Sequence, residues 1–177
     1  MSNERIPKVT VNCECKRIEL EIYELNPEFI VCHCELCQLL HAGPGFGAHC
    51  NGVKVVNGAE YITMYKSDKV PMAVWHFCSV CGTKLFFKFD DDLWENKNDK
   101  YALSVGALQG NEKSKEISKQ LKMVREAYYD EAIKPHYYNF KENTAKLSIE
   151  ETAEYYKQLS QTSISGDWDA VYTNIDK

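Results

Sequence analysis

Seven of the eight cysteines of this chain fall into three tight groups, and thiols at such spacing can bind a metal ion. The groups are C-E-C at residues 13–15, C-H-C-E-L-C at residues 32–37 and C-S-V-C at residues 78–81, while Cys50 stands alone. Disulfide bonds usually join cysteines that are spread along the chain, whereas a metal ion needs neighbouring thiolates that converge on one point. The spacing therefore favours metal sites over disulfide bonds or inert buried thiols.

The first and last groups together supply four thiolates, the number that a closed tetrahedral zinc site needs. Residues i and i+2 of a strand point the same way, so Cys13 and Cys15 are expected to present both sulfurs to one side. Cys78 and Cys81 flank a two-residue turn, and the Gly82 that follows tolerates a positive φ. Because closed sites are structural, we expect this one to stabilise the fold by joining the first strand to the middle of the domain.

The middle group, Cys32, Cys34 and Cys37, supplies only three thiolates and leaves a fourth position. Catalytic zinc sites typically keep that position open, and a thiol bound there would be deprotonated and held as a nucleophile. Two alternatives remain open. His41 lies four residues after Cys37 and could close a second structural site from the same helical face. In the second alternative, only the four-cysteine site binds metal, and the three thiols of the middle group form a surface cluster.

The remaining histidines and Cys50 are not expected to bind metal. His33 lies between two cysteines of an expected strand, so its side chain should point to the opposite face. We expect His49, His76 and His136 to be ordinary core or surface residues, and Cys50 to be a small buried hydrophobe.

Alternation of apolar and polar residues predicts that a β-rich domain positions these groups. Residues 8–24 read as two strand segments that meet at the first cysteine pair. Further strands are expected at residues 29–34, 46–50, 53–56, 61–66, 73–78, 84–89 and 101–105. Residues 35–41 are expected to form a helical turn, which the A-G-P-G sequence at residues 42–45 ends.

The character of the chain changes after Gly110. Ile117, Leu121 and Val124 have helical spacing, although an extended conformation remains open. Ser148 and Glu151 form a capping box, and apolar residues follow it at helical intervals. We therefore predict a mainly β fold with a C-terminal helical extension. Residues 1–140 would form the zinc-binding domain, and residues 141–177 a helix and polar tail packed on the same domain.

Composition narrows the classes of partner. The 177 residues carry a formal net charge of −5, with 44% apolar and 27% charged residues, which is typical of a globular protein. No basic stripe is present, so we expect no nucleic-acid partner. The N-terminal sequence lacks a long apolar run, so we expect no signal peptide and no membrane span. A cytoplasmic protein with reduced thiols is the resulting expectation.

The order and spacing of the cysteine groups resemble those of the glutathione-dependent formaldehyde-activating enzyme family, which includes centromere protein V-like proteins. The similarity spans roughly residues 8–140 and implies a β-tent fold of antiparallel sheets. It implies two Zn²⁺ per chain: a structural zinc on Cys13, Cys15, Cys78 and Cys81, and a catalytic zinc on Cys32, Cys34 and Cys37. The implied activity is that of a carbon–sulfur lyase, which joins the sulfur of glutathione to formaldehyde and gives S-hydroxymethylglutathione.

Two positions depart from the family's usual pattern, and neither is a metal ligand. Lys16 stands where members usually have glycine, and His76 stands where arginine is common. The two departures therefore leave the predicted metal sites unchanged but put the identity of the substrate in doubt. Glutathione is anionic, so its binding would need a basic rim, to which Lys16, Arg17, Lys54 and Lys84 are candidate contributors, although such residues are more often plain solvated charges.

Two functions from different classes follow. In the first, a small thiol such as glutathione is bound as thiolate at the three-cysteine zinc and attacks a small aldehyde, with His33, His41 and His49 as the nearest acid–base candidates. The alternative is a non-enzymatic zinc-binding module for protein interaction, with two closed sites and a surface of C-terminal tyrosines: Tyr128, Tyr129, Tyr137, Tyr138, Tyr155 and Tyr156. We expect these tyrosines to pack against the sheet instead. An open pocket over the three cysteines favours the enzyme, and closure by His41 favours the module.

Overall fold

The computed structural model describes residues 4–90, 99–131, 148, 150, 151 and 154 of the chain. The chain divides into two compact units, residues 1–133 and residues 134–177. The predicted boundary at residue 140 and the packing of residues 141–177 on the first domain stay predictions. Five residues singled out in the sequence lie outside the described residues: His136, Tyr137, Tyr138, Tyr155 and Tyr156.

The capping box expected in the second unit is confirmed. The backbone N–H of Ser148 donates to Oε2 of Glu151 (2.7 Å), and the backbone N–H of Glu151 donates to Oγ of Ser148 (3.2 Å). Glu150, Glu151 and Glu154 are helical. The two reciprocal bonds satisfy N–H groups that a helix N-terminus leaves without partners, which is why a helix begins at this sequence.

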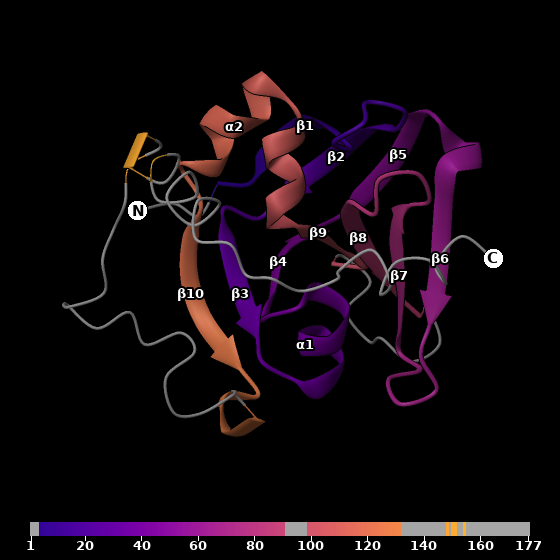
Figure 1. Cartoon of the computed structure of the whole chain (residues 1–177), viewed down its shortest axis with the longest axis vertical. Helices are drawn as coiled ribbons and strands as arrows, with labels where there is room; N and C mark the ends of the chain where they lie inside the picture. The colour runs from indigo at the N-terminus through magenta and orange to yellow at the C-terminus, as the bar shows by residue number, and fades with distance from the viewer. Residues whose placement is uncertain (1–3, 91–98, 132–147, 149, 152–153, 155–177) are drawn as a thin grey trace, which may run out of the picture. The chain divides into compact units, whose positions relative to one another are not determined.

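The first unit is mainly β, as predicted, and contains two sheets (Figure 1). The smaller sheet has the order β1 (Ile6–Asn12), β2 (Glu19–Leu25), β5 (Gly52–Asn57). The larger has the order β10 (Lys122–Ala127), β3 (Glu28–Cys32), β4 (Gly45–Cys50), β9 (Tyr101–Ser104), β8 (Lys84–Phe89), β7 (Ala73–Cys78), β6 (Ile62–Lys66). All neighbouring strands are antiparallel except β10 and β3, which are parallel.

The hydrophobic core of this unit takes side chains from both sheets. Alternation in β1 and β2 places Val9, Val11, Leu20 and Ile22 inside, as the period-two pattern predicts. Cys50 of β4 is fully buried in the same core, and burial raises the pKa of its thiol to about 12. The prediction that Cys50 is a small buried hydrophobe is therefore confirmed.

The helical elements of the first unit are short. They are α1 (Glu35–His41), α2 (Glu112–Ser118) and the 3₁₀ turns η1 (Ala59–Tyr61), η2 (Val105–Gly110) and η3 (Tyr129–Glu131). The helical spacing noted after Gly110 holds only for its first part, because Ile117 is in α2 whereas Val124 is in β10. Pairing with the edge of β3 favours the extended conformation there. Among the described residues, no helix has the length and apolar character needed to cross a membrane.

Candidate metal centres and the adjoining cavity

The first and last cysteine groups meet at the end of the sheets where two turns lie together. Cys13 and Cys15 are in the turn between β1 and β2, where the N–H of Lys16 donates to the carbonyl of Cys13 (3.0 Å). The expectation that strand alternation aligns the two sulfurs was wrong, because β1 ends at Asn12. The tight turn brings them to 3.5 Å instead.

Cys78 ends β7, and Cys81 lies in the turn before β8. The N–H of Gly82 donates to the carbonyl of Cys78 (2.9 Å), and Gly82 has a φ of +73°. In the other turn the residue after the second cysteine, Lys16, has a φ of +62°. Both turns thus use the left-handed conformation at the same place, and one of them does so without glycine.

The four sulfurs of these turns fit a tetrahedral zinc site. Their Sγ atoms all lie within 4.8 Å of one another, with 3.8 Å between those of Cys15 and Cys78. A tetrahedron with zinc–sulfur bonds of 2.3 Å places its sulfurs about 3.8 Å apart. Donors also face these sulfurs: the N–H of Ile18 lies 3.3 Å from Cys13 Sγ, and Thr83 Oγ1 lies 3.2 Å from Cys81 Sγ. Burial opposes ionisation of Cys81, but hydrogen bonds from Thr83 and the backbone lower its pKa to about 6.

The middle group lies where β3 runs into α1. Cys32 is the last residue of β3, Cys34 is the N-cap of α1, and Cys37 lies in its first turn. The sulfur of Cys34 accepts a hydrogen bond from the N–H of Cys37 (3.4 Å), so the cap itself turns these side chains together. All three sulfurs lie within 4.8 Å of one another. Ala42, in the left-handed conformation (φ 51°), ends the helix, as the A-G-P-G sequence predicts.

The ionisation of these three thiols is consistent with a cation between them. Hydrogen bonds from the thiol of Cys37 and the N–H of Cys34 lower the pKa of Cys32 to about 6. The same bond to Cys32, together with burial, raises the pKa of Cys37, and burial raises that of Cys34. One thiolate therefore forms readily, while a second and third would repel it. Three thiolates together need a bound cation, and the donor set suits zinc.

The histidines near this group fall into two sets. Among the described residues, the ligand atoms that lie within 4.8 Å of one another here come from the three cysteines alone, and the ring nitrogens of His41 are outside this cluster. His41 instead lines an adjoining cavity, where burial and the charge of Lys84 lower its pKa. His33 points away as predicted, with Nε2 2.8 Å from a carboxylate oxygen of Glu126. His49, expected to be an ordinary core or surface residue, lines the same cavity as His41.

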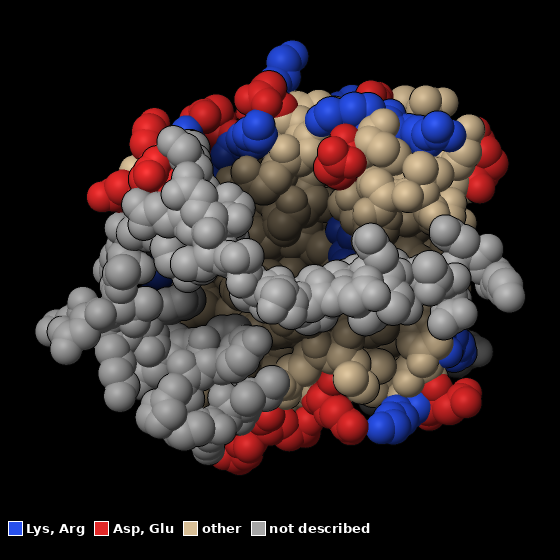
Figure 2. Space-filling model, in the orientation of Figure 1, with Lys and Arg blue, Asp and Glu red and all other residues tan. Residues whose placement is uncertain are grey.

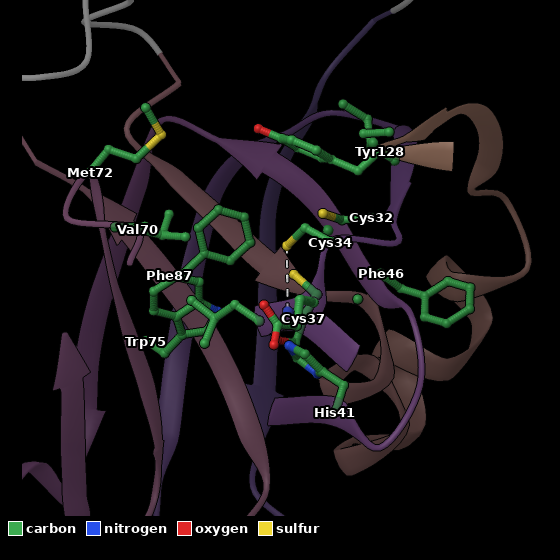
Figure 3. Close-up of a pocket in the computed structure, with 18 of the residues that line it drawn as sticks. Cys32, Cys34, Cys37, His41, Phe46, Val70, Met72, Trp75, Phe87 and Tyr128 are labelled. Carbon is green, nitrogen blue, oxygen red and sulfur yellow. Dashed lines mark hydrogen bonds between the residues drawn. The ribbon is translucent and has the colours of Figure 1, made fainter. Parts of the chain in front are cut away.

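The cavity has a volume of about 550 Å³ and is bordered by all three cysteines (Figure 3). Most of its lining is apolar, with large side chains from β3, β7, β8 and the loop before β7: Ile30, Val70, Met72, Trp75, Phe87 and Phe89. Tyr128, which we expected to pack against the sheet, is 62% exposed and also borders the cavity. The aromatic residues were not identified from the sequence, although the pattern F-x-F at residues 87–89 of a predicted strand places two rings on one face.

None of the four basic residues considered for a rim is among the described residues that line this cavity. Among the described residues that line it, Lys69 is the only lysine or arginine, and its ammonium lies 3.3 Å from the carboxylate of Glu35. The four candidates contact other groups: Lys16 the carbonyl of Gly110, Arg17 the ring of Tyr61, Lys54 the carboxylate of Glu21, and Lys84 the ring of Phe77. Figure 2 shows charged side chains mainly toward the margins of this face, with a Lys or Arg side chain also visible within the hollow between them.

Comparison with known proteins agrees with the cysteine pattern. The family described as glutathione-dependent formaldehyde-activating enzyme matches residues 8–130. The chain belongs to this family. A crystal structure of a Rhodobacter sphaeroides protein is similar over 67% of this chain and 100% of that one, with 23% sequence identity and a TM-score of 0.48. A search of curated proteins gave no significant match. The resemblance stated from the sequence is therefore confirmed at the level of the family.

Proposed function

We propose that this family member is a zinc-dependent, carbon–sulfur lyase-like enzyme that adds a thiol to a small aldehyde. Family membership supports the reaction class, because the family is described by glutathione-dependent formaldehyde activation. The observation that carries the proposal is the cavity bordered by Cys32, Cys34 and Cys37, with His41 outside the ligand cluster. The interaction-module alternative needs a closed second site, and the described residues provide no fourth ligand there.

The proposed roles divide the cysteines into a structural set and a catalytic set. The structural zinc would be held by Cys13, Cys15, Cys78 and Cys81, and the second zinc by Cys32, Cys34 and Cys37. When bound, the second ion would lower the pKa of a coordinated thiol and favour its thiolate. In the overall reaction a sulfur–carbon bond forms, the carbonyl π bond breaks, and the thiol proton ends on the former carbonyl oxygen.

The chain's own residues would seat the two reactants and move this proton. The cavity walls would hold the thiol and the carbonyl together, which raises the effective concentration of each toward the other. His41 and His49 line the cavity and can carry a proton between the sulfur and the carbonyl oxygen. His33 does not line it, so this histidine is removed from the acid–base candidates.

The test is adduct formation between glutathione and formaldehyde, followed by NMR, alongside zinc analysis of the purified protein. We expect two zinc ions in the wild type and one in Cys34→Ser, with turnover lost in the variant. Cys50→Ala is the matched control, because Cys50 is buried in the core and belongs to neither cysteine cluster. It should keep both ions and full turnover. Retention of both the second zinc and turnover in Cys34→Ser would show the catalytic assignment to be wrong.

A further inference from the structure

The cavity is much larger than a one-carbon aldehyde requires. Its volume is about 550 Å³. Formaldehyde is little bigger than a water molecule, whose share of liquid volume is about 30 Å³. A cavity of this size is in the range that binds whole small organic molecules. The space beside the three sulfurs therefore fits a substrate with a sizeable side group.

The wall facing the cavity is aromatic and firmly supported. Trp75 of β7 pairs in register with Phe87 of β8, and Phe89 lies two residues further on the same face. The ring centroids of Trp75 and Phe87 are 6.2 Å apart and stacked, and those of Phe87 and Phe89 are 5.1 Å apart edge to face. Trp75 and Phe89 are only 7% and 8% exposed, with Leu36 and Ala73 packed in the same cluster. Flat rings held in this way offer a preformed surface for another flat group.

The aromatic wall lies close enough to the three sulfurs for one ligand to contact both. In Figure 3, Trp75, Phe87 and Val70 lie on one side of Cys34 and Cys37, and Tyr128 also borders the cavity. Met72 stands near the outer part of the wall and is 38% exposed. Its flexible thioether can adapt to groups of different shape. A ligand whose reactive atom reaches the sulfurs would place its side group along the rings.

The charges of the described residues at the cavity do not suit glutathione, which carries two carboxylates and one ammonium. Among the described lining residues, Lys69 is the only lysine or arginine, and it is paired with Glu35. Glu131 adds a second carboxylate, which accepts a hydrogen bond from the N–H of Glu35 (3.0 Å). Moving a carboxylate from water into an apolar space without a cation is costly. The described part of the lining therefore favours an uncharged ligand over glutathione.

We propose that the cavity binds an uncharged substrate with an aromatic or comparably bulky apolar side group, and that Phe87 and Trp75 determine this specificity. The inference rests on the proposed thiol–aldehyde addition and names its substrate class. Either reactant can carry the side group. The reaction balances as before: sulfur bonds to the carbonyl carbon, the π bond opens, and the thiol proton moves to oxygen.

Binding to zinc-loaded protein tests the ligand class without reference to turnover. Isothermal titration would compare benzyl mercaptan with 2-mercaptoethanol and glutathione, and benzaldehyde with acetaldehyde. Since burial of one phenyl ring is involved, we expect at least one aromatic probe to bind about tenfold tighter or more than its small analogue, and benzyl mercaptan to bind tighter than glutathione. Phe87→Ala should remove most of this preference. Phe77→Ala is the matched control, because Phe77 lies on the neighbouring strand β7 but does not line the cavity.

Phe87→Leu keeps an apolar side chain and guards against a folding defect in the alanine variant. It should fold like the wild type and retain part of the aromatic preference. Turnover with two pairs, benzyl mercaptan with formaldehyde and 2-mercaptoethanol with benzaldehyde, then shows which reactant carries the ring. The pair that reacts faster identifies the reactant that carries the ring, and the inference is supported whether this is the thiol or the aldehyde.

Two outcomes separate the inference from the function beneath it. If neither aromatic probe binds tighter than its small analogue, while glutathione and formaldehyde react in a Cys34-dependent way, the inference is overturned and the proposed function stands. If aromatic probes bind with the expected dependence on Phe87 but no thiol–aldehyde pair reacts, the ligand class stands and the proposed function is wrong. A preference unaffected by Phe87→Ala would also overturn the inference, because the ring would then bind elsewhere.

Discussion

Gly45 is the position where the three-cysteine group can be disturbed most locally. A Cβ added there would lie 3.1 Å from Sγ and 3.3 Å from Cβ of Cys37, where ordinary contacts begin at 3.4 Å. Gly45→Ala must therefore push Cys37 away by a few tenths of an ångström. Ligand distances in metal sites are held to about 0.2 Å, and small losses of ligand orientation reduce metal affinity about 10- to 100-fold. We expect a loss of this size at the second site only.

The assay is zinc competition with a graded chelator, read together with thermal unfolding. Gly45→Ala should lose the more weakly held zinc at a lower chelator concentration, while the four-cysteine site keeps its affinity. Overpacking here should lower the free energy of unfolding by less than about 2 kcal/mol, because the contact involves a short helix at the edge of the core. Gly47→Ala in the same strand is the control, since its Cβ would meet the ring of Phe87, at 3.3 Å, and Cβ of Ala102, at 3.7 Å, but none of the cysteines. Unchanged affinity of both sites in Gly45→Ala would refute the placement of Cys37 as a ligand.

Three further predictions concern stability. Lys16→Gly should be about 1 kcal/mol more stable than Lys16→Ala in urea unfolding, because the left-handed φ of +62° strains residues with a Cβ but not glycine. Equal stability of the two variants would argue against strain in this turn. A chelator should release the zinc of the three-cysteine group with little change in melting temperature, whereas release of the zinc of the four-cysteine site should lower that temperature on the order of 10 °C or more. Cys78→Ser should resemble the protein that has lost the four-cysteine zinc. A melting temperature independent of both ions would contradict the structural role. Hydrogen bonds from Lys8 and Tyr23 lower the pKa of Glu21 to about 2, so the stability that Glu21 adds is present above about pH 4.5 and is lost as the pH falls toward 2. The unfolding midpoints of the wild type and Glu21→Gln should therefore differ at pH 6 and converge near pH 2, and a constant difference across this range would exclude the ionised carboxylate as its cause.

The elements that carry a short repeating pattern could be predicted from the sequence. The strands at residues 73–78 and 84–89 and the helix at residues 35–41 have the predicted bounds, because alternation and a clear stop signal define them locally. The cysteine groups likewise converge as their spacing suggests. Cys13 and Cys15 show the limit of this reasoning: the pair converges, but through a turn, since strand β1 ends one residue earlier.

Features that depend on pairing between distant segments could not be predicted in this way. The aromatic wall exists because Trp75 is in register with Phe87, and nothing in either strand alone fixes that register. The parallel pairing of β10 with β3 overrides a helical spacing in residues 117–124 for the same reason. None of the four basic residues considered for a rim lines the cavity. The side of the sheet on which each of them lies depends on strand order, which short-range patterns do not contain.

The two cysteine clusters differ in the length of chain that they close, and this difference suits them to different tasks. The contact between Cys15 and Cys78 joins residues 63 positions apart, so a metal there restrains much of the unfolded chain. The group from Cys32 to Cys37 closes only six residues, and its N-cap hydrogen bond already orders that stretch. A metal in the second group would therefore contribute little to folding. Its coordination could respond to a ligand in the cavity without loss of the fold, as the proposed exchange of substrate and product at an open position requires.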